Sequence, residues 1–564
     1  MSQLLTVAVA ALFSALVSTL AAAQQNPDAG TLLREIERGT QPALPRPAPQ
    51  VVPAAPAATP DTSVQVEVKG FRLRGATLIA ETVLIEALKP WTGRRLSFAE
   101  LQKAADAIVE IYRARGYFAR AYLPEQDLAS GIVTIAIVEG RLGGMRIETG
   151  GRETRLSERT VRRFMLARQQ VGAPVAPEAL QRGTQLLNDL PGVRASSILE
   201  PGSKEGESLL AVKVEDQPLL TGMAQLDNTG VRSTGENRAS GMLSLGNPFG
   251  IGDQAGLNAA KSQGSDYGRL SYALPLGGDG LRFGVAAAYL KYDSSTAGIR
   301  SNGTALTEGL NLAYPIRRGS DWNLNITAAY DQKRFQNFTA NIEISNKRNT
   351  VSSAALSGDS VDGFGGGGFT QSGLTYSSGK LELGRNATEI AADQLANGPA
   401  RNGGYSKWSW LLSRLQRVSE LDTFWLSLSG QWAGKNLDSS EKIGIAGPYA
   451  VRAYAAGEAS GDDGVLLTAE WRRQIGEALQ LVAFYDEGRA RLDHNINVAS
   501  NAVNTVALSG AGLGLNWGKA SNIMLRATIA WRLGSNPLRN AVTGLDSDGT
   551  RRDPRGSIAA IKAF

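Results

Sequence analysis

The sequence predicts a membrane β protein: a transmembrane β-barrel of about 16 antiparallel strands over residues 218–564, preceded by two small α+β modules. Three observations predict this fold. From residue 218 onward apolar and polar residues alternate in long runs, many of which end in Trp or Tyr. Residues 63–217 show helical periodicity between short strands. The first residues form an apolar segment typical of exported proteins.

The composition excludes several classes of chemistry. The 564 residues contain no Cys and a single His, His494, which excludes disulfides, thiol nucleophiles and multi-His metal sites. A Ser-His-Asp triad would need His494, which we expect in a solvated loop instead. The net charge of +6 is spread along the chain without a dense basic block. We therefore expect no enzyme, no metal, no cofactor and no nucleic-acid partner.

The N-terminal segment predicts export. Residues Leu4 to Ala23 are almost entirely apolar or small, and Ala21-Ala22-Ala23 before Gln24 fits a cleavage site, so residues 1–23 are interpreted as a signal peptide. No later stretch has the roughly 18 consecutive apolar residues that a spanning helix needs. The mature chain should leave the cytoplasm without a transmembrane helix.

A short helix and a linker should come next. Within residues 24–39, Leu32, Leu33 and Ile36 lie on one side of an amphipathic helix. A helix this short is marginal in water, so it must dock on another part of the protein or be disordered. Residues 40–62 are rich in Pro and Ala, cannot build a core and serve as a tether.

The two modules, 63–142 and 143–217, show the same predicted order of elements, β-α-α-β-β. In the first, Ser97 and Glu100 have the spacing of a capping box at the start of a helix that ends at Gly116. The matching order at a spacing of about 75 residues favours an internal repeat over two unrelated domains.

The alternation after residue 218 is read as a barrel. Trp322, Leu324 and Ile326 share one face of a run, and Asn323 and Asn325 share the other. A soluble sandwich also alternates, but its strands have about 5–6 residues, whereas the runs here have about 9–12 and membrane strands need about 9–11. Lipid cannot satisfy an open strand edge, so the sheet should close.

Loop lengths predict the orientation of the barrel, because periplasmic turns are short and outer loops are long. The predicted long loops are Asp331–Asn349, Gly384–Gly404, Gly434–Asp463 and Gly534–Gly556. The predicted short turns include Pro275–Gly280, Val418–Leu421 and Arg473–Ala478. The two sets alternate, which places the modules in the periplasm. The Gly-rich stretch 363–368 falls on the turn side, and its length is unexplained.

Two motifs carry a family resemblance. The loop 434–463 contains the run Gly447-Pro448-Tyr449-Ala450-Val451-Arg452-Ala453-Tyr454, followed by Gly457-Glu458-Ala459-Ser460-Gly461-Asp462. A later strand contains Phe484-Tyr485-Asp486. With these motifs, the whole mature chain resembles the outer-membrane transporters of two-partner secretion, of the haemolysin and filamentous-haemagglutinin type. The resemblance implies that the modules are periplasmic POTRA domains, that the 24–39 helix plugs the barrel and that the motif loop folds back into the lumen.

The resemblance also implies a residue pair. Val451, Arg452, Ala453 and Tyr454 match the family's Val-Arg-Gly-Tyr signature, with Ala453 in place of Gly, and Gly457 and Glu458 belong to the segment after it. The barrel-wall partner is Asp486, with Phe484. Strand alternation agrees independently, because both residues fall on the polar, lumen-facing side of their strand. The alternative is that Arg452 is an exposed loop arginine.

Two further sites are expected. The edge strand near Phe118, Arg120 and Tyr122 in the first module is the candidate client-binding edge, because an exposed edge can add a strand from another chain. The terminal Phe564 resembles the aromatic residue that the barrel-assembly machinery reads, although Lys562 interrupts the apolar face of that strand.

The predicted function is an outer-membrane pore that recognises an unfolded exported partner through its POTRA domains and translocates it to the cell surface. The expected partners are a secreted exoprotein with an N-terminal secretion domain, outer-membrane lipid and, during biogenesis, the barrel-assembly machinery. The alternatives are a barrel-assembly or insertion factor and a passive porin. The sequence does not identify the client.

Overall fold

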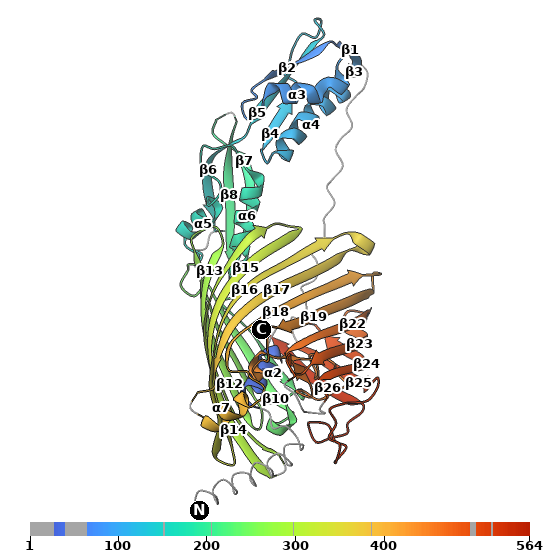
Figure 1. The fold of residues 1–564 in the computed structure, drawn as a ribbon. Coiled ribbons are helices and arrows are strands. Elements are labelled where there is room, and N and C mark those ends of the chain that lie inside the picture. Colours follow the sequence, from blue (N-terminus) through green and yellow to red (C-terminus); the bar gives the residue numbers. More distant parts are fainter. Residues whose placement is uncertain are drawn as a thin grey trace, which may run out of the picture.

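The computed structural model describes residues 28–39, 65–149, 153–204, 206–296, 298–384, 386–496, 503–519 and 523–564. The predicted signal peptide and the whole of the predicted linker lie outside these residues. Two α+β modules stand at one end of a large barrel, and the short helix α2 (Ala29–Gly39) lies inside the barrel (Figure 1). No helix in the described part of the chain is both long and apolar enough to cross a membrane.

The first module has one strand pair more than the sequence predicted. Its elements are β1 (Gln65–Val68), β2 (Gly70–Arg74), α3 (Glu81–Leu88), η1 (Lys89–Trp91), β3 (Arg94–Ser97), α4 (Phe98–Ala114), β4 (Ala119–Tyr122) and β5 (Ile132–Glu139). β2 and β4 flank β5, parallel and antiparallel to it, while β1 pairs separately with β3. The predicted capping box is present, because the Ser97 hydroxyl accepts from the N–H of Glu100 and the Glu100 carboxylate accepts from the N–H of Ser97.

The second module repeats the three-stranded sheet of the first, without a counterpart of the β1–β3 pair. Its elements are β6 (Arg141–Glu148), α5 (Glu158–Met165), α6 (Pro177–Asn188), β7 (Val193–Pro201) and β8 (Glu207–Asp216). β6 runs parallel to β8 and β7 runs antiparallel to it, as β2 and β4 do around β5. The predicted order β-α-α-β-β is present in the second module, and the first has the same order with β1 and β3 added; each module has its own apolar core.

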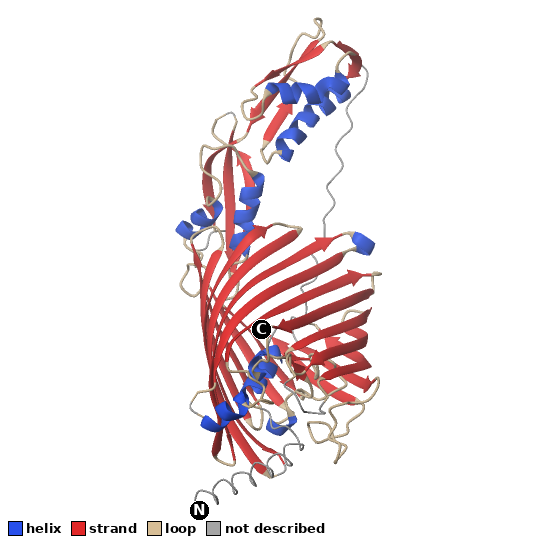
Figure 2. Ribbon diagram, in the orientation of Figure 1, coloured by secondary structure: helices blue, strands red, loops and turns tan. Residues whose placement is uncertain are grey.

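Sixteen antiparallel strands close the barrel, as predicted. They are β9 (Leu220–Asp227), β10 (Arg238–Gly246), β11 (Gln254–Lys261), β12 (Ser265–Leu276), β13 (Leu281–Thr296), β14 (Ile299–Arg318), β15 (Trp322–Thr339), β16 (Ile342–Asp362), β17 (Gly368–Glu382), β18 (Gly403–Arg417), β19 (Asp422–Ala433), β22 (Asp463–Ile475), β23 (Leu479–Arg491), β24 (Thr505–Gly518), β25 (Ile523–Arg532) and β26 (Arg555–Ala563). The strands form a continuous wall around the lumen in Figure 2. β26 pairs with β9 to complete the ring.

One predicted outer loop is wrong. Residues 331–349 are not a loop: β15 continues to Thr339, β16 starts at Ile342, and only Ala340 and Asn341 connect them, both with positive φ (49° and 66°). This is the φ signature of a two-residue hairpin turn. β16 reaches 21 residues, far longer than a bilayer requires. Polar side chains in this part of the sequence indicated a loop, but they belong to strands that extend beyond the apolar band.

The other connections agree with the predicted orientation. One long connection joins β17 to β18 and includes α7 (Ala387–Gln394). A second joins β19 to β22, and a third joins β25 to β26. Short turns lie at the end that carries the modules. The Gly-rich stretch forms a turn with a 3₁₀ element, η3 (Phe364–Gly366), in which Gly365, Gly366 and Gly367 all have positive φ.

Ion pairs fix the second module to its end of the barrel. Asp279, in the turn between β12 and β13, accepts from Arg168 Nε at 2.7 Å and from Arg182 Nε at 3.2 Å. At the end of β14, Arg318 Nε donates to Asp189 Oδ2 at 2.8 Å. The second module therefore stands against the turns next to β12–β15, and these contacts leave the β16–β24 side of this opening uncovered (Figure 1).

Candidate functional site

The connection between β19 and β22 folds back into the barrel. It contains η4 (Ser439–Glu441), β20 (Ile443–Gly444) and β21 (Ser460–Gly461), and β20 pairs with β21 as a small hairpin. We call residues 434–462 the lumenal loop. Its buried apolar residues pack against wall residues of β22–β25; the cluster is Ile445, Ala446, Ala450, Val451, Ala453, Tyr454 and Ala459 with Leu466, Val482, Phe484, Ala490, Val506, Leu508 and Ala530.

Arg452 at the loop's tip contacts the wall residues that the sequence predicted. Its Nε donates to Asp486 Oδ2 at 2.8 Å and its Nη2 to Asp486 Oδ1 at 2.8 Å, while its backbone N–H donates to the same carboxylate at 3.2 Å. The guanidinium carbon lies 3.5 Å from the centroid of the Phe484 ring. Arg452 is therefore not an exposed loop arginine, because a bidentate, charge-assisted pair and an aromatic face hold it.

Sequence reasoning missed a third wall residue, Glu470. Its Oε1 accepts from Arg452 Nη1 at 2.7 Å, and its Oε2 accepts from Arg472 Nε at 2.8 Å. Burial disfavours the charged guanidinium, but hydrogen bonds and charges from Asp486 and Glu470 outweigh it, so the pKa of Arg452 is raised. A signal was available, because Glu470 and Arg472 are charged residues on the lumen-facing side of β22.

Ala453 fits without the left-handed conformation that glycine favours, because it is not among the described non-glycine residues with positive φ. A Cβ added at Gly510 of β24 would lie 2.7 Å from the Ala453 methyl group. The methyl group thus occupies space that a glycine of the wall leaves open. Gly457 does have positive φ (77°), and Tyr454 is buried with the guanidinium of Arg532 at 4.9 Å from its ring centroid.

Glu458 ties the lumenal loop to the connection between β25 and β26. Its Oε2 accepts from the backbone N–H of Ser547 at 2.9 Å and from its hydroxyl at 2.6 Å, and its Oε1 accepts from Asn536. In the same connection, burial would raise the pKa of Asp546, but hydrogen bonds from Arg532 and Asn536 lower it to about 2.

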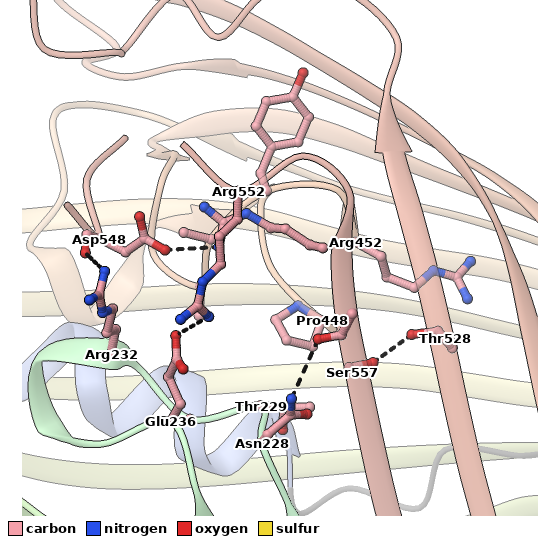
Figure 3. A pocket seen from close by; sticks show the side chains of 16 residues that line it. Asn228, Thr229, Arg232, Glu236, Pro448, Arg452, Thr528, Asp548, Arg552 and Ser557 are labelled. Atoms are coloured by element: carbon pink, nitrogen blue, oxygen red, sulfur yellow. Dashed lines mark hydrogen bonds and ion pairs between the residues drawn. The ribbon is translucent and has the colours of Figure 1, made fainter. Parts of the chain in front are cut away.

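Figure 3 shows the pocket where the lumenal loop, the connection 533–554 and the β9–β10 hairpin meet. Arg552 Nη1 donates to Glu236 Oε1 at 2.6 Å, and Arg232 Nη1 donates to the Asp548 carbonyl at 3.3 Å. These contacts link the first hairpin of the barrel to its last connection. The β9–β26 closure is therefore supported by side chains as well as by backbone pairing.

Helix α2 lies in the lumen against the lumenal loop and the inner faces of β12–β15. Leu32, Leu33 and Ile36, the predicted apolar face, are buried in one cluster with wall residues. Arg34 Nη1 donates to the carbonyls of Ser439 at 2.7 Å and Lys442 at 3.0 Å, and Arg38 Nη1 donates to the Gly444 carbonyl at 2.9 Å. The predicted docking of the helix thus uses both an apolar face and the loop's backbone. 

Buried ions also hold this end of the loop. Glu441 lies within 2.7 Å of Lys333 Nζ and 2.9 Å of Lys407 Nζ on the wall. Burial opposes ionisation of Glu441, yet the two lysines lower its pKa to about 2. Next to it, Lys347 Nζ bridges Asp438 at 2.5 Å and Asp28, just before α2, at 3.6 Å. Lys347 therefore connects helix, loop and wall.

The predicted client-binding edge is only partly free. β4 is an edge strand, and Arg120 and Tyr122 lie on it, with the guanidinium of Arg120 5.8 Å from the Tyr122 ring centroid. Phe118 precedes β4, and its backbone is occupied: its N–H donates to the Val175 carbonyl at 3.2 Å and its C=O accepts from Gly140 at 2.9 Å. Phe118 therefore joins the two modules. The sequence did not show this, because Val175 belongs to the second module.

Two other residues complete the comparison with the sequence. Phe564 pairs through its backbone with Gly222 in both directions, at 2.8 and 3.0 Å, and its side chain is exposed. His494, expected in a solvated loop, does lie in the connection after β23, but it is partly buried, with its Nδ1 2.8 Å from Asp463 Oδ2. Asp463 is close because it begins β22 opposite Arg491, the last residue of β23.

Comparison with known proteins identifies the family. Residues 206–517, more than half of the chain, match the model of the haemolysin secretion/activation protein ShlB/FhaC/HecB, and residues 66–140 match the POTRA domain of ShlB type. The chain belongs to the ShlB/FhaC/HecB family. It is an outer-membrane transporter of two-partner secretion with POTRA-type domains in the periplasm.

Relatives within this family extend over nearly the whole chain. The heme/hemopexin transporter protein HuxB of Haemophilus influenzae (strain 86-028NP) is 27% identical over 530 residues, which cover 90% of this chain and 92% of the relative. The outer membrane transporter CdiB of Escherichia coli is 26% identical over 73% of this chain and 70% of its own. The solved structure of CdiB from Escherichia coli has the same fold, with a TM-score of 0.70, 22% identity and coverage of 90% and 93%. These findings favour a secretion transporter over an assembly factor or a passive porin.

Proposed function

We propose that this transporter captures an unfolded exported protein with its POTRA domains and passes it through a lumen that helix α2 and the lumenal loop close at rest. The observation that carries the proposal is the manner of closure. Both segments fill the lumen, and α2 is held by apolar packing and by side-chain bonds to the carbonyls of the loop, not by the barrel's own strand pairing. Such contents can leave without opening the sheet.

The client in this proposal is a secreted exoprotein with an N-terminal secretion domain. Arg120 and Tyr122 on the free edge of β4 support capture by strand addition, since backbone groups on an unpaired edge bind any extended chain. The proposal includes contact of the outer barrel face with outer-membrane lipid and recognition of Phe564 by the barrel-assembly machinery. It includes no nucleic acid and no catalysis.

The proposed division of the chain follows from these roles. It comprises a signal peptide (1–23), a plug helix (24–39), a linker (40–62), two POTRA domains (63–142 and 143–217) and the barrel (218–564).

Two experiments test the proposal. Deletion of residues 28–38 should raise the single-channel conductance of the purified protein in planar bilayers, whereas an unchanged conductance would argue against a plug. Deletion of the gene should abolish surface appearance of one exported protein, identified by comparing surface proteins with and without it. If no exported protein is lost, the proposed function is wrong.

A further inference from the structure

An unusual row of side chains lies on the lumen wall near the periplasmic end. Val361 of β16, Phe369 of β17, Leu415 of β18 and Trp425 of β19 are direct cross-strand neighbours: Val361 pairs with Phe369, Phe369 with Leu415, and Leu415 with Trp425. We call these four residues the mouth row. Each lies within four residues of the end of its strand, next to the short turns on the side of the modules.

The mouth row faces the lumen and not the lipid. Tyr405 of β18 and Ala433 of β19 pack with Leu437 of the lumenal loop, which fixes the inner side of both strands. Leu415 and Trp425 lie an even number of residues from them along uninterrupted pairings, so they share that side. The guanidinium of Arg472, a lumen-facing residue of β22, lies 5.0 Å from the Trp425 ring centroid.

The lumenal side of the same four strands becomes polar just beyond the mouth row. One step deeper, the cross-strand row is Asp359, Gln371, Ser413 and Ser427. Barrel interiors are usually polar because water fills them, and apolar side chains there gain little from the barrel itself. Two steps deeper, Leu411 is 43% exposed because its neighbour Gly373 has no side chain. Apolar surface therefore recurs along the wall of β18.

The mouth row takes little part in the packing of its own protein, and the Arg472 guanidinium beside Trp425 is its one aromatic or cation–π contact among the described residues. All four are partly exposed, and none belongs to an apolar core cluster of the described residues. The indole N–H of Trp425 has no acceptor within the described chain, so no hydrogen bond ties the ring to the wall. An aromatic and aliphatic surface that its own protein leaves partly exposed indicates a binding surface.

We propose that the mouth row is a lumenal docking site for an extended apolar segment of the exported polypeptide, engaged after the POTRA domains and before the plug. The inference rests on the proposed function. The position selects the occupant, because the row lies inside the pore, at its periplasmic entrance, on the β16–β19 wall that the ion pairs of the second module leave uncovered. Four strands about 4.8 Å apart span roughly 14 Å, the length of four or five extended residues.

The physical role is transient binding. An unfolded chain that enters the pore has exposed apolar side chains, and a row of apolar side chains lowers the free energy of that segment relative to water. The polar row beyond it binds the same segment less well. A segment released from the row therefore moves onto a polar part of the wall, which offers its apolar side chains less contact than the mouth row does.

A binding measurement tests the site without secretion. Because the chain has no Cys, Ser413→Cys labelled with bimane gives a single reporter next to the row. The probe is a short synthetic peptide in which Val and Phe alternate with Ser and Gln, added to the purified full-length protein. We expect saturable binding that Phe369→Ser or Leu415→Ser each weakens about tenfold. Leu412→Ser, the same change on the lipid side of β18, should leave binding unchanged.

Three outcomes would overturn the inference. A peptide in which Ser replaces every Val and Phe would bind as tightly as the probe, or the Leu415→Ser protein would bind the probe as tightly as the parent. In the third, a bimane label at Met223→Cys on β9, seven strands away around the barrel, would give the same signal as the label at Ser413→Cys. A disulfide between Leu415→Cys and Val51→Cys in the resting protein would assign the row to the linker and would also reject the client as occupant.

Export in cells separates this inference from the proposed function. At equal barrel abundance, Leu415→Ser should reduce surface appearance of the client several-fold. Unchanged export by Leu415→Ser would reject the mouth row while leaving the transporter function intact. A parent protein that exports nothing would reject the proposed function itself.

Discussion

Replacement of Arg452 by Ala should release the lumenal loop from the barrel wall. The substitution removes two side-chain bonds to Asp486, at 2.8 Å each, and one to Glu470, at 2.7 Å. It leaves Asp486, which is fully buried, and the mostly buried Glu470 without their cation. Breaking a buried ion pair in this way costs about 3–5 kcal/mol, mainly because the remaining charge is stranded.

The magnitude sets the size of the signal. Even about 3 kcal/mol corresponds to a more than 100-fold increase in the population of the undocked loop. In the Cys-free chain, Ala450→Cys places a buried thiol in the loop, since Ala450 is 3% exposed. The rate of its alkylation by a water-soluble maleimide reports the undocked fraction. Arg452→Ala should raise that rate about 100-fold.

A matched control distinguishes the buried pair from general loss of charge. Arg473 forms an ion pair with Asp422 at 3.4 Å near the periplasmic turns, and its side chain is 46% exposed. Exposed pairs contribute about 1 kcal/mol or less, so Arg473→Ala should not alter the alkylation rate. Equal rates for Arg452→Ala and its parent would refute the view that Arg452 holds the loop.

Three further predictions concern Glu458 of the lumenal loop, Gly510 of the barrel wall and Glu139 of the first module. Glu458→Gln removes the charge that binds the 533–554 connection, so proteolysis of that connection in intact cells should become faster; unchanged proteolysis would show that the contact is dispensable. Gly510→Val places a side chain against the Ala453 methyl group and should raise alkylation of Ala450→Cys, whereas the smaller Gly510→Ala should do so less. Burial raises the pKa of Glu139 in the first module, but hydrogen bonds from Thr77, Leu78 and Tyr112 lower it overall. Its stabilising effect is therefore complete above the ordinary value near 4.5 and is lost as the pH falls through the lowered pKa. The test is the thermal unfolding temperature of the module, detected by its sensitivity to a protease and measured at a series of pH values from 7 downward. This temperature should fall at acid pH in the parent, and the part of the fall that is due to Glu139 should be absent in Glu139→Gln.

Alternation in the sequence located the wall residues because it is a local property. The side of a strand on which a residue lies depends only on counting by two along that strand. Phe484 and Asp486 could therefore be assigned to the lumen before any partner was placed. The capping box at Ser97 was likewise determined locally, by two residues three positions apart.

The same local reasoning predicts a loop at residues 331–349, where polar residues in fact continue β15 and β16 beyond the bilayer. The stretch is rich in polar residues, with Phe335, Phe338, Ile342 and Ile344 as its large apolar side chains. Its strand conformation comes from pairing with other strands: residues 331–339 of β15 pair with β14, and residues 342–347 of β16 pair back onto β15. Pairing with distant segments has no signature in the paired segment's own sequence.

The sequence by itself determined the barrel, the repeated order of helices and strands in the modules, the apolar face of α2 and the lumenal side of Phe484 and Asp486; the pairing of Arg452 with Asp486 was expected from the family resemblance. Only the tertiary structure decided which other groups meet. Glu470 is the second acceptor for Arg452, the 533–554 connection binds Glu458, and carbonyls of the lumenal loop accept hydrogen bonds from α2. The physical reason is the closure of the ring. Side-chain periodicity is set by bonds between adjacent residues, whereas closing sixteen strands brings together segments hundreds of residues apart.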